Sequence, residues 1–148
     1  MVRDPLPQAE YEAIFSRVPR LTVEVVITAA EMQGVLLGRR KDGPCQGLWH
    51  LPGGTVRFAE SLTEAVGRVA RQELGLEVVA GPLIGYIEYP SHLDLGDWPV
   101  GMAFDAELVQ VGVPHNVTRP GRVSWFRRLP EEMHDEQKAF LRAHGLAS

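Results

Sequence analysis

The sequence predicts an α/β fold in which helices pack on a mixed or mostly antiparallel sheet. The elements run in the order helix, two strands, helix, three strands, helix, without the regular alternation that a fully parallel sheet requires. The chain has 148 residues, of which 45% are hydrophobic and 23% charged, and these proportions are ordinary for a soluble globular protein. This length suits one domain with one core, so a single domain is expected over residues 1–148.

The first half of the chain predicts one helix and two strands. A helix is expected over Leu6–Pro19, because Tyr11, Ile14, Phe15 and Val18 recur on one helical face and Pro19 stops it. The β-branched run Leu21–Ala29 predicts a strand, and Gly34–Lys41 predicts a second strand after the turn "AEMQG". The Gly and Pro residues of "KDGPCQGL" predict a loop, and "LWHLP" is a short extended segment beyond it.

The second half predicts two helices and three strands. The helix Leu62–Leu74 begins with the capping-box pair Ser61 and Glu64 and ends at Gly75. The remaining expected elements are strands over 76–90, with a Gly-Pro break, over 98–111 and over 122–129, and a helix over 134–145. Phe140 and Leu141 are expected to face the core from that last helix.

Charge and composition exclude several classes of function. The net charge of −4 argues against binding to a nucleic acid polymer, which depends on many Lys and Arg contacts with phosphates. Cys45 is the single cysteine, so no intrachain disulfide is possible, and we interpret it as an incidental loop thiol rather than a nucleophile. No signal-like or membrane-spanning apolar run is present, so a cytoplasmic protein without membrane contact is expected.

The residues Gly53-Gly54 and the helix after them predict a metal and phosphate site. Adjacent glycines can adopt positive φ and let their backbone approach a ligand, with carbonyls for a hard cation and amides for phosphate oxygens. On the helix, Val69, Gln72 and Glu73 share one face. Three carboxylates there would hold Mg²⁺ shared with substrate phosphates, but only Glu73 is acidic.

The stretch "LPGGTVRFAESLTEAVGRVARQELGLEV" resembles the box of the Nudix hydrolases, G-x5-E-x7-R-E-U-x-E-E-x-G-U, in which U is a bulky apolar residue. The matching residues are Gly54, Glu60, Arg68, Glu73, Gly75 and Leu76. Val69 and Gln72 stand where the box has glutamates. The resemblance implies a Nudix-type α/β/α sandwich and hydrolysis of a nucleoside diphosphate derivative with Mg²⁺ (Mn²⁺ possible).

One branch of that family, the GDP-mannose mannosyl hydrolases, lacks acidic residues at the same two positions. The segments "QAEYEAIFSRVPRLTVE", "LLGRRKDGPCQGLWHLPGGTV" and "AGPLIGYIEY" are also similar to that branch. The resemblance therefore implies one metal ion, a nucleoside diphosphate sugar as substrate, and attack at the sugar carbon that releases a nucleoside diphosphate and a free sugar. It also implies a possible homodimer through the N-terminal helix and first strand.

The resemblance assigns roles to individual residues. The Gly53 carbonyl and Glu73 would bind the metal, and Glu60 would pair with Arg68, close to the metal or as a further ligand. Arg40 would contact the diphosphate and assist catalysis, whereas Arg39 is a weaker candidate for substrate binding. Glu24 would help to read the nucleotide, and the amide of Gly54 would face its phosphates.

The catalytic base is the least defined part of the predicted site. The branch places a histidine and a metal-binding glutamine at positions that align with Pro120 and Arg119, and an arginine where this chain has Thr55. We expect His115 to act as the base, with His92 as an alternative, because histidine titrates near neutral pH. Two other functions stay open: a Nudix pyrophosphatase that cleaves a P–O bond with one metal, and a nucleotide-binding module without catalysis.

Overall fold

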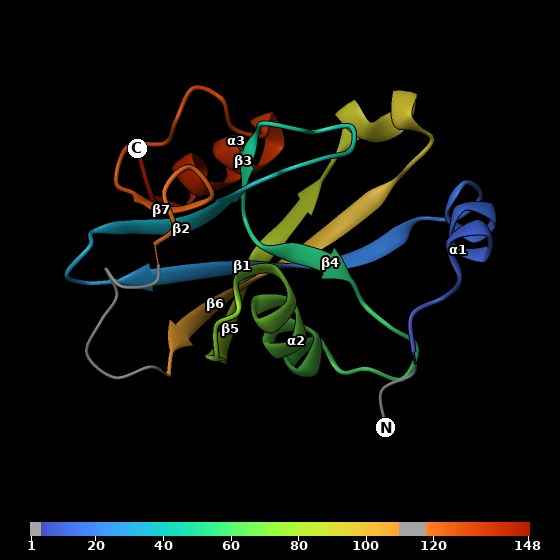
Figure 1. The fold of residues 1–148 in the computed structure, drawn as a ribbon, viewed down its shortest axis with the longest axis horizontal. Helices are drawn as coiled ribbons and strands as arrows, with labels where there is room; N and C mark the ends of the chain where they lie inside the picture. Colours follow the sequence, from blue (N-terminus) through green and yellow to red (C-terminus); the bar gives the residue numbers. More distant parts are fainter. Residues whose placement is uncertain (1–3, 110–117) are drawn as a thin grey trace.

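The computed structural model describes residues 4–109 and 118–148, which form one mixed seven-stranded sheet with helices on both sides (Figure 1). The strands lie in the order β3 (Trp49–His50), β2 (Gly34–Arg39), β1 (Arg20–Ala29), β6 (Pro99–Leu108) and β5 (Val78–Glu88). The short strand β4 (Gly53–Thr55) pairs with β1, and β7 (Val123–Phe126) pairs with β2. The pair β1–β6 is parallel and the other pairs are antiparallel, as the predicted fold class requires.

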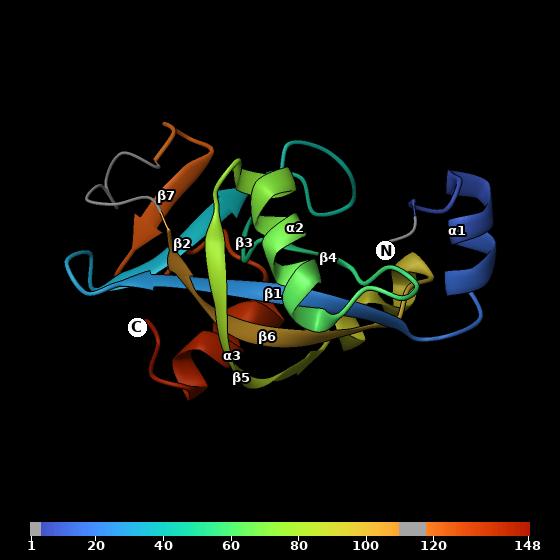
Figure 2. The same ribbon diagram turned by 90° about the horizontal axis from the view of Figure 1, so that it is seen from below.

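Two helices cover opposite faces of the sheet, α2 (Leu62–Leu74) on one and α3 (Asp135–Ala143) on the other (Figure 2). Alternate residues of β1 point into the two hydrophobic cores, one on each face of the sheet. Val23 packs in the core that contains Val66 of α2, whereas Val26 packs in the core that contains Leu141 of α3. The predicted α/β/α sandwich is therefore confirmed.

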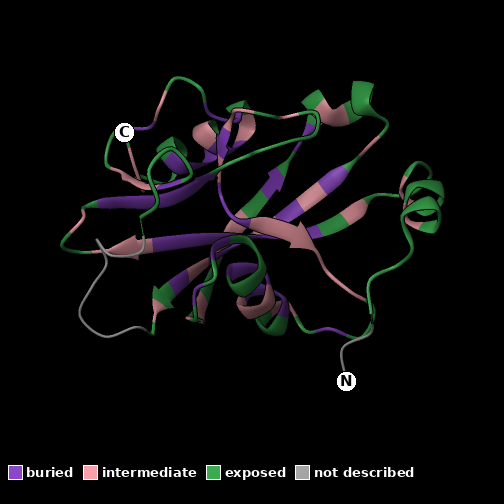
Figure 3. Ribbon diagram, in the orientation of Figure 1, coloured by how far each residue is buried: buried purple, intermediate pink, exposed green. Residues whose placement is uncertain are grey.

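The third helix, α1 (Gln8–Phe15), is shorter than the predicted helix and has no buried residue (Figure 3). It lies beyond the end of the sheet, and its Tyr11 hydroxyl bonds to Thr55 Oγ1 at 2.6 Å. Of its predicted apolar face, Ile14 is 38% exposed and the following Val18 46% exposed. The helical pattern is confirmed, but residues 4–109 and 118–148 cover this face only in part, with Tyr11 and Phe15 half-buried.

Both predicted ends of α2 are present. The Ser61 hydroxyl accepts a hydrogen bond from the Glu64 amide at 3.1 Å, and Gly75 closes the helix with φ of 68°. Val66 and Leu74 are buried in the core, so the helix is fixed against the sheet by its apolar face. No helix of the described residues is both long and apolar enough to cross a lipid bilayer.

Several element predictions were wrong. The strand β5 continues through Gly81-Pro82 and absorbs the expected break as register shifts around Leu83. The 3₁₀ helix η1 (Pro90–Leu95) was not predicted, and neither was the strand β4 that contains Gly53-Gly54. The end of the predicted strand 98–111 lies outside the described residues.

Candidate active site at the edge of strand β1

Gly53 and Gly54 of β4 lack positive φ, and the reason for glycine at these positions is the close approach of neighbouring side chains. Gly53 and Gly54 pair with Glu24 and Val23 of β1, and neither is among the glycines of the described residues that have positive φ. A Cβ on Gly53 would collide with the Glu24 carboxyl, and a Cβ on Gly54 would come within 3.1 Å of the Val69 side chain. The positive φ expected for this pair was therefore wrong, whereas the close approach of another group was correct.

The Glu24 carboxyl lies buried on the face of β1 that α3 covers. Its Oε1 accepts hydrogen bonds from Thr22 Oγ1 and from the Tyr89 hydroxyl, each at 3.0 Å. The Gln137 amide donates to the Tyr89 oxygen at 3.1 Å and accepts from the Leu51 amide at 2.7 Å. These contacts fix the carboxyl between the sheet and α3.

The buried position of Glu24 changes its titration. Desolvation raises the pKa of this carboxyl from 4.5 to about 7, although the hydrogen bonds from Tyr89 and Thr22 and the charges of Arg20 and Arg40 oppose the shift. A carboxyl with such a pKa changes its protonation state near neutral pH, as an acid–base catalyst must. The sequence predicted Glu24 only as a substrate-binding residue.

Arg40 stands on the wall between two pockets. One pocket, here called the carboxyl pocket, contains Arg40, Glu24, His50, Gly53 and Gly54. The other, the basic pocket, contains Arg40 and Glu73 together with further cationic side chains, namely Arg39, Lys41, Arg71, Arg119 and Arg122. A ligand beside Arg40 can therefore extend into a pocket with a buried carboxyl on one side and into a cationic pocket on the other.

The two strongest metal-ligand candidates lie on one surface. Gly53, Gly54 and Glu73 line a depression between α2 and the N-terminal segment, so that a backbone carbonyl and a carboxylate are offered together. Desolvation raises the pKa of Glu73, and the charge of Arg40 lowers it. Hard oxygen donors of this kind fit Mg²⁺, which keeps several waters and binds substrate phosphates with its remaining positions. The assignment of Gly53 and Glu73 as ligands stays a prediction.

Glu60 forms the ion pair expected with Arg68. Its Oε2 accepts from Arg68 Nε at 2.6 Å, and its Oε1 accepts from Arg68 Nη2 at 2.9 Å and from the Arg57 amide at 3.0 Å. Arg68 also donates to the Thr55 carbonyl at 2.8 Å, which ties α2 to β4. These bonds orient the helix, and a metal-binding role for Glu60 stays a prediction.

The two residues that depart from the box have clear structural roles. Val69 is fully buried and packs below Gly54 in the core around α2. Gln72 is exposed, and its oxygen accepts from Arg68 Nη1 at 2.9 Å. Of the three positions that would carry acidic groups, only Glu73 therefore presents a carboxylate to the surface.

The other predicted residues have less direct placements. Arg39 donates from Nε to the Gly47 carbonyl at 2.9 Å, and its guanidinium lies 5.9 Å from the Trp49 ring centre, so it supports the loop before β3. His115 lies outside the described residues. His92 lies in η1 with its Nε2 2.9 Å from His134 Nε2, a contact that the sequence did not predict.

Sequence reasoning also missed His50 and Arg20. His50 contributes to both pockets beside Arg40, and burial lowers its pKa to about 4, so it is neutral at pH 7. Arg20 donates to Thr55 Oγ1 at 2.8 Å, so a guanidinium contacts the residue that follows the Gly-Gly pair. The only available signal was a polar residue inside "LWHLP" for His50, and none existed for Arg20.

This fold and site define a class of protein. The helix α2 carries Glu73 on its exposed side, and the Glu60–Arg68 ion pair joins it to the segment before it. The helix lies against the Gly-Gly strand β4, and Arg40 lies between the two pockets. Residues 18–136 match the family model described as the NUDIX domain. The chain therefore belongs to the Nudix family, which confirms the predicted family, the fold and the general class, a Nudix hydrolase.

The curated proteins that are similar to this chain include one from an archaeon and one from a bacterium. "Low-salt glycan biosynthesis protein Agl8" of Haloferax volcanii is 44% identical over 84 residues, which are 57% of this chain and 53% of that protein. A "Putative 8-oxo-dGTP diphosphatase" of Bacillus subtilis is 35% identical over 106 residues, 68% of each chain. The match thus spans about half of the Haloferax protein and about two thirds of the Bacillus protein.

Solved structures have the same fold. A MutT Nudix hydrolase from Burkholderia pseudomallei has a TM-score of 0.67 at 26% identity and covers 89% of this chain and all of its own. A MutT protein from Methanosarcina mazei has a TM-score of 0.68 at 23% identity, with 86% and 93% covered. A UDP-X diphosphatase has a TM-score of 0.64 at 17% identity over 95% of this chain and 72% of its own.

Proposed function

We propose that the protein hydrolyses a nucleoside diphosphate sugar with one Mg²⁺ ion by attack at the sugar carbon. The observation that carries this proposal is the position of Arg40, on the wall shared by the carboxyl pocket and the basic pocket. A diphosphate held by Arg40 would direct its sugar into the pocket that contains Glu24. It would also bring its phosphates toward Glu73 and the metal.

The residues support a displacement at carbon. Glu24 would take a proton from water while the water oxygen forms a bond to the anomeric carbon. The bond from that carbon to the diphosphate oxygen breaks, and the diphosphate leaves with the electron pair. Arg40 stabilises the charge that develops on the leaving group, because a guanidinium donates two directed hydrogen bonds to phosphate oxygens.

The metal would supply additional stabilisation of the leaving diphosphate when it is bound. Gly53 and Glu73 would hold it, and His50, which is neutral, lines the pocket without adding charge. A reduced set of carboxylates is sufficient for this reaction, because no metal-bound nucleophile is needed at a sugar carbon. This agrees with Val69 and Gln72 in place of two glutamates.

The names of the two relatives support different parts of the proposal. The name of the Haloferax protein, a glycan biosynthesis protein, supports a glycan-related substrate. The Bacillus protein, a putative diphosphatase, supports the second candidate, a pyrophosphatase that cleaves a P–O bond. A homodimer and a cytoplasmic location stay predictions, the former supported by the exposed apolar residues Ile14 and Val18 near α1.

Product analysis in ¹⁸O-labelled water tests this proposal. The protein is incubated with Mg²⁺ and a panel of nucleotide sugars, and the products are separated by anion exchange and weighed by mass spectrometry. Attack at carbon gives an unlabelled nucleoside diphosphate and a labelled free sugar. A labelled nucleoside monophosphate or sugar phosphate would instead establish P–O cleavage, and nucleotide binding without products would identify a non-catalytic module.

A further inference from the structure

Three side chains with nitrogen or sulfur donors meet at the rim of the carboxyl pocket. Cys45 in the loop between β2 and β3, His92 in η1 and His134 before α3 have ligand atoms that all lie within 4.8 Å of one another. We call these residues the Cys-His-His cluster. None of them belongs to the candidate magnesium site at Gly53 and Glu73.

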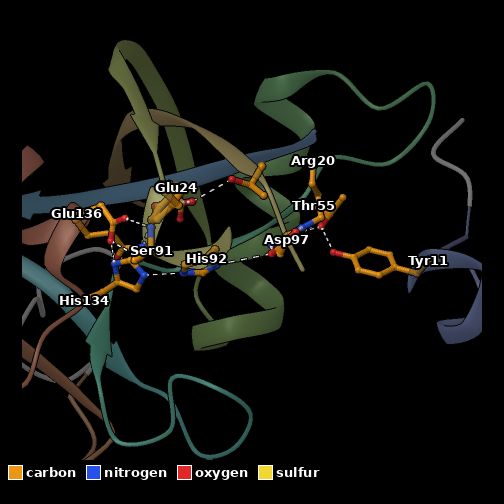
Figure 4. A network of polar contacts seen from close by, with 12 residues as sticks. Tyr11, Arg20, Glu24, Thr55, Ser91, His92, Asp97, His134 and Glu136 are labelled. Atoms are coloured by element: carbon orange, nitrogen blue, oxygen red, sulfur yellow. Dashed lines mark hydrogen bonds and ion pairs between the residues drawn. The ribbon is translucent and has the colours of Figure 1, made fainter. Parts of the chain in front are cut away.

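The two imidazoles are oriented as metal ligands are. His92 Nε2 and His134 Nε2 face each other at 2.9 Å, and Figure 4 shows the rings pointing together. The other nitrogen of each ring faces a carboxylate: His92 Nδ1 lies 3.7 Å from Asp97 Oδ2, and His134 Nδ1 lies 3.7 Å from Glu136 Oε1. Histidines that bind metals have this arrangement, with one nitrogen toward the ion and the other toward a carboxylate or carbonyl.

The two carboxylates are themselves held in place. Asp97 accepts from Arg20 Nε at 3.0 Å and from Arg20 Nη2 at 2.6 Å. Glu136 accepts from the Ser91 amide at 3.0 Å and from the Ser91 hydroxyl at 2.7 Å. The orientation of both imidazoles is therefore supported from outside the cluster before any ion binds.

His134 is the more enclosed of the two imidazoles. The residue is only 8% exposed, yet its Nδ1 is buried without a hydrogen-bond partner in the described part of the chain. Glu136 lies near this atom but beyond hydrogen-bond distance. An ion at Nε2 would fix the proton on Nδ1 and strengthen its attraction to that carboxylate.

We propose that Cys45 Sγ, His92 Nε2 and His134 Nε2 bind one Zn²⁺ ion, whose fourth position opens into the carboxyl pocket. Imidazole and thiolate donors select zinc over Mg²⁺ and Ca²⁺, which prefer oxygen. On binding, the Cys45 thiol loses its proton to solvent and each neutral imidazole contributes a lone pair. The ion joins the loop before β3, η1 and α3 into one wall of the pocket.

Cobalt spectroscopy tests the proposed site in the full chain. The protein is prepared free of metals under reducing conditions, and Co²⁺ is titrated in the presence of excess Mg²⁺, which occupies oxygen sites. The chain has a single cysteine, so a thiolate-to-cobalt charge-transfer band reports Cys45 alone. We expect this band to reach its maximum at one Co²⁺ per chain and to disappear when Zn²⁺ is added.

Variants separate zinc binding from a plain hydrogen bond between two histidines. Cys45→Ser should abolish the band, and His92→Ala or His134→Ala should weaken Zn²⁺ affinity about 100-fold or more in competition with a chelator. Glu136→Gln should weaken it about 10- to 100-fold, because it changes the carboxylate beside a ligand. His144→Gln is the matched control, since this exposed histidine after α3 lies outside the cluster.

The proposal would be overturned by the absence of the band in the folded protein or by equal Zn²⁺ affinities of the wild type and Cys45→Ser. Circular dichroism of each variant confirms that the sheet is intact, and Cys45 is only partly buried in a loop, so its replacement should leave the fold unchanged. No substrate is needed for these measurements. Zinc binding can therefore fail while the proposed hydrolase function stands, and the reverse.

Discussion

Replacing Glu24 with Gln tests whether this carboxyl is buried at the expense of stability. Its pKa rises from 4.5 to about 7 because β1, β4 and β6 remove it from water. The folded chain thus keeps a proton that the unfolded chain releases, so Glu24 destabilises the fold progressively as pH rises from the unfolded to the folded pKa. Since a tenfold change in proton affinity is about 1.4 kcal/mol, the loss reaches about 3 kcal/mol above pH 7.

Urea unfolding at a series of pH values between about 5 and about 8 measures this effect. Glu24→Gln is neutral throughout, so its free energy of unfolding should rise relative to that of the wild type by about 2.5 kcal/mol between about pH 5 and about pH 8. Glu31→Gln, at an exposed turn, controls for the loss of one negative charge. A difference between wild type and Glu24→Gln that is constant with pH would refute the reasoning.

Four further predictions concern the site. Glu73→Gln should abolish Mg²⁺-dependent turnover, measured with excess metal; full activity would remove Glu73 from the metal site. Arg40→Ala should lower kcat/KM about 100-fold, a typical loss for one charge-stabilising donor, and Arg39→Ala should lower it much less; equal losses would contradict the position of Arg40 between the pockets. In the wild type, kcat/KM should rise as pH increases through about 7, because only deprotonated Glu24 can accept a proton, and a flat profile would exclude it as the base. Gly53→Ala should destabilise the fold by about 1–3 kcal/mol in urea unfolding, because its Cβ meets the Glu24 carboxyl, and a neutral effect would contradict that contact.

The sequence predicted the elements whose signals are local. The helix α2 was placed correctly because Ser61, Glu64 and Gly75 mark its ends and its apolar face has a regular period. The strands β1 and β2 are dense in β-branched or aliphatic residues. The sandwich itself followed from the order of these elements and from the resemblance to the Nudix box.

Features that depend on distant partners could not be predicted. Gly53 must be glycine because of Glu24, which lies far away in the sequence and reaches it only through strand pairing. The same holds for His92 and His134, which come from separate elements and appear in the sequence as isolated histidines. The apolar face of α1 has the period of a buried helix, but the described residues cover it only in part. The helical period of the apolar residues predicts which face is apolar, but it does not predict which surface packs against that face.

The parallel pairing of β1 with β6 has a consequence for the order of assembly. β1 and β2 are joined by a short turn and can associate early. By contrast, α2 and β5 lie between β1 and β6 in the sequence, so the pairing of β1 with β6 closes a long loop and is expected later. The Glu24 carboxyl becomes enclosed when β6 and β4 both close on β1, so its dehydration belongs to this late step. The chain therefore completes the carboxyl pocket and takes up the proton on Glu24 in the same folding step.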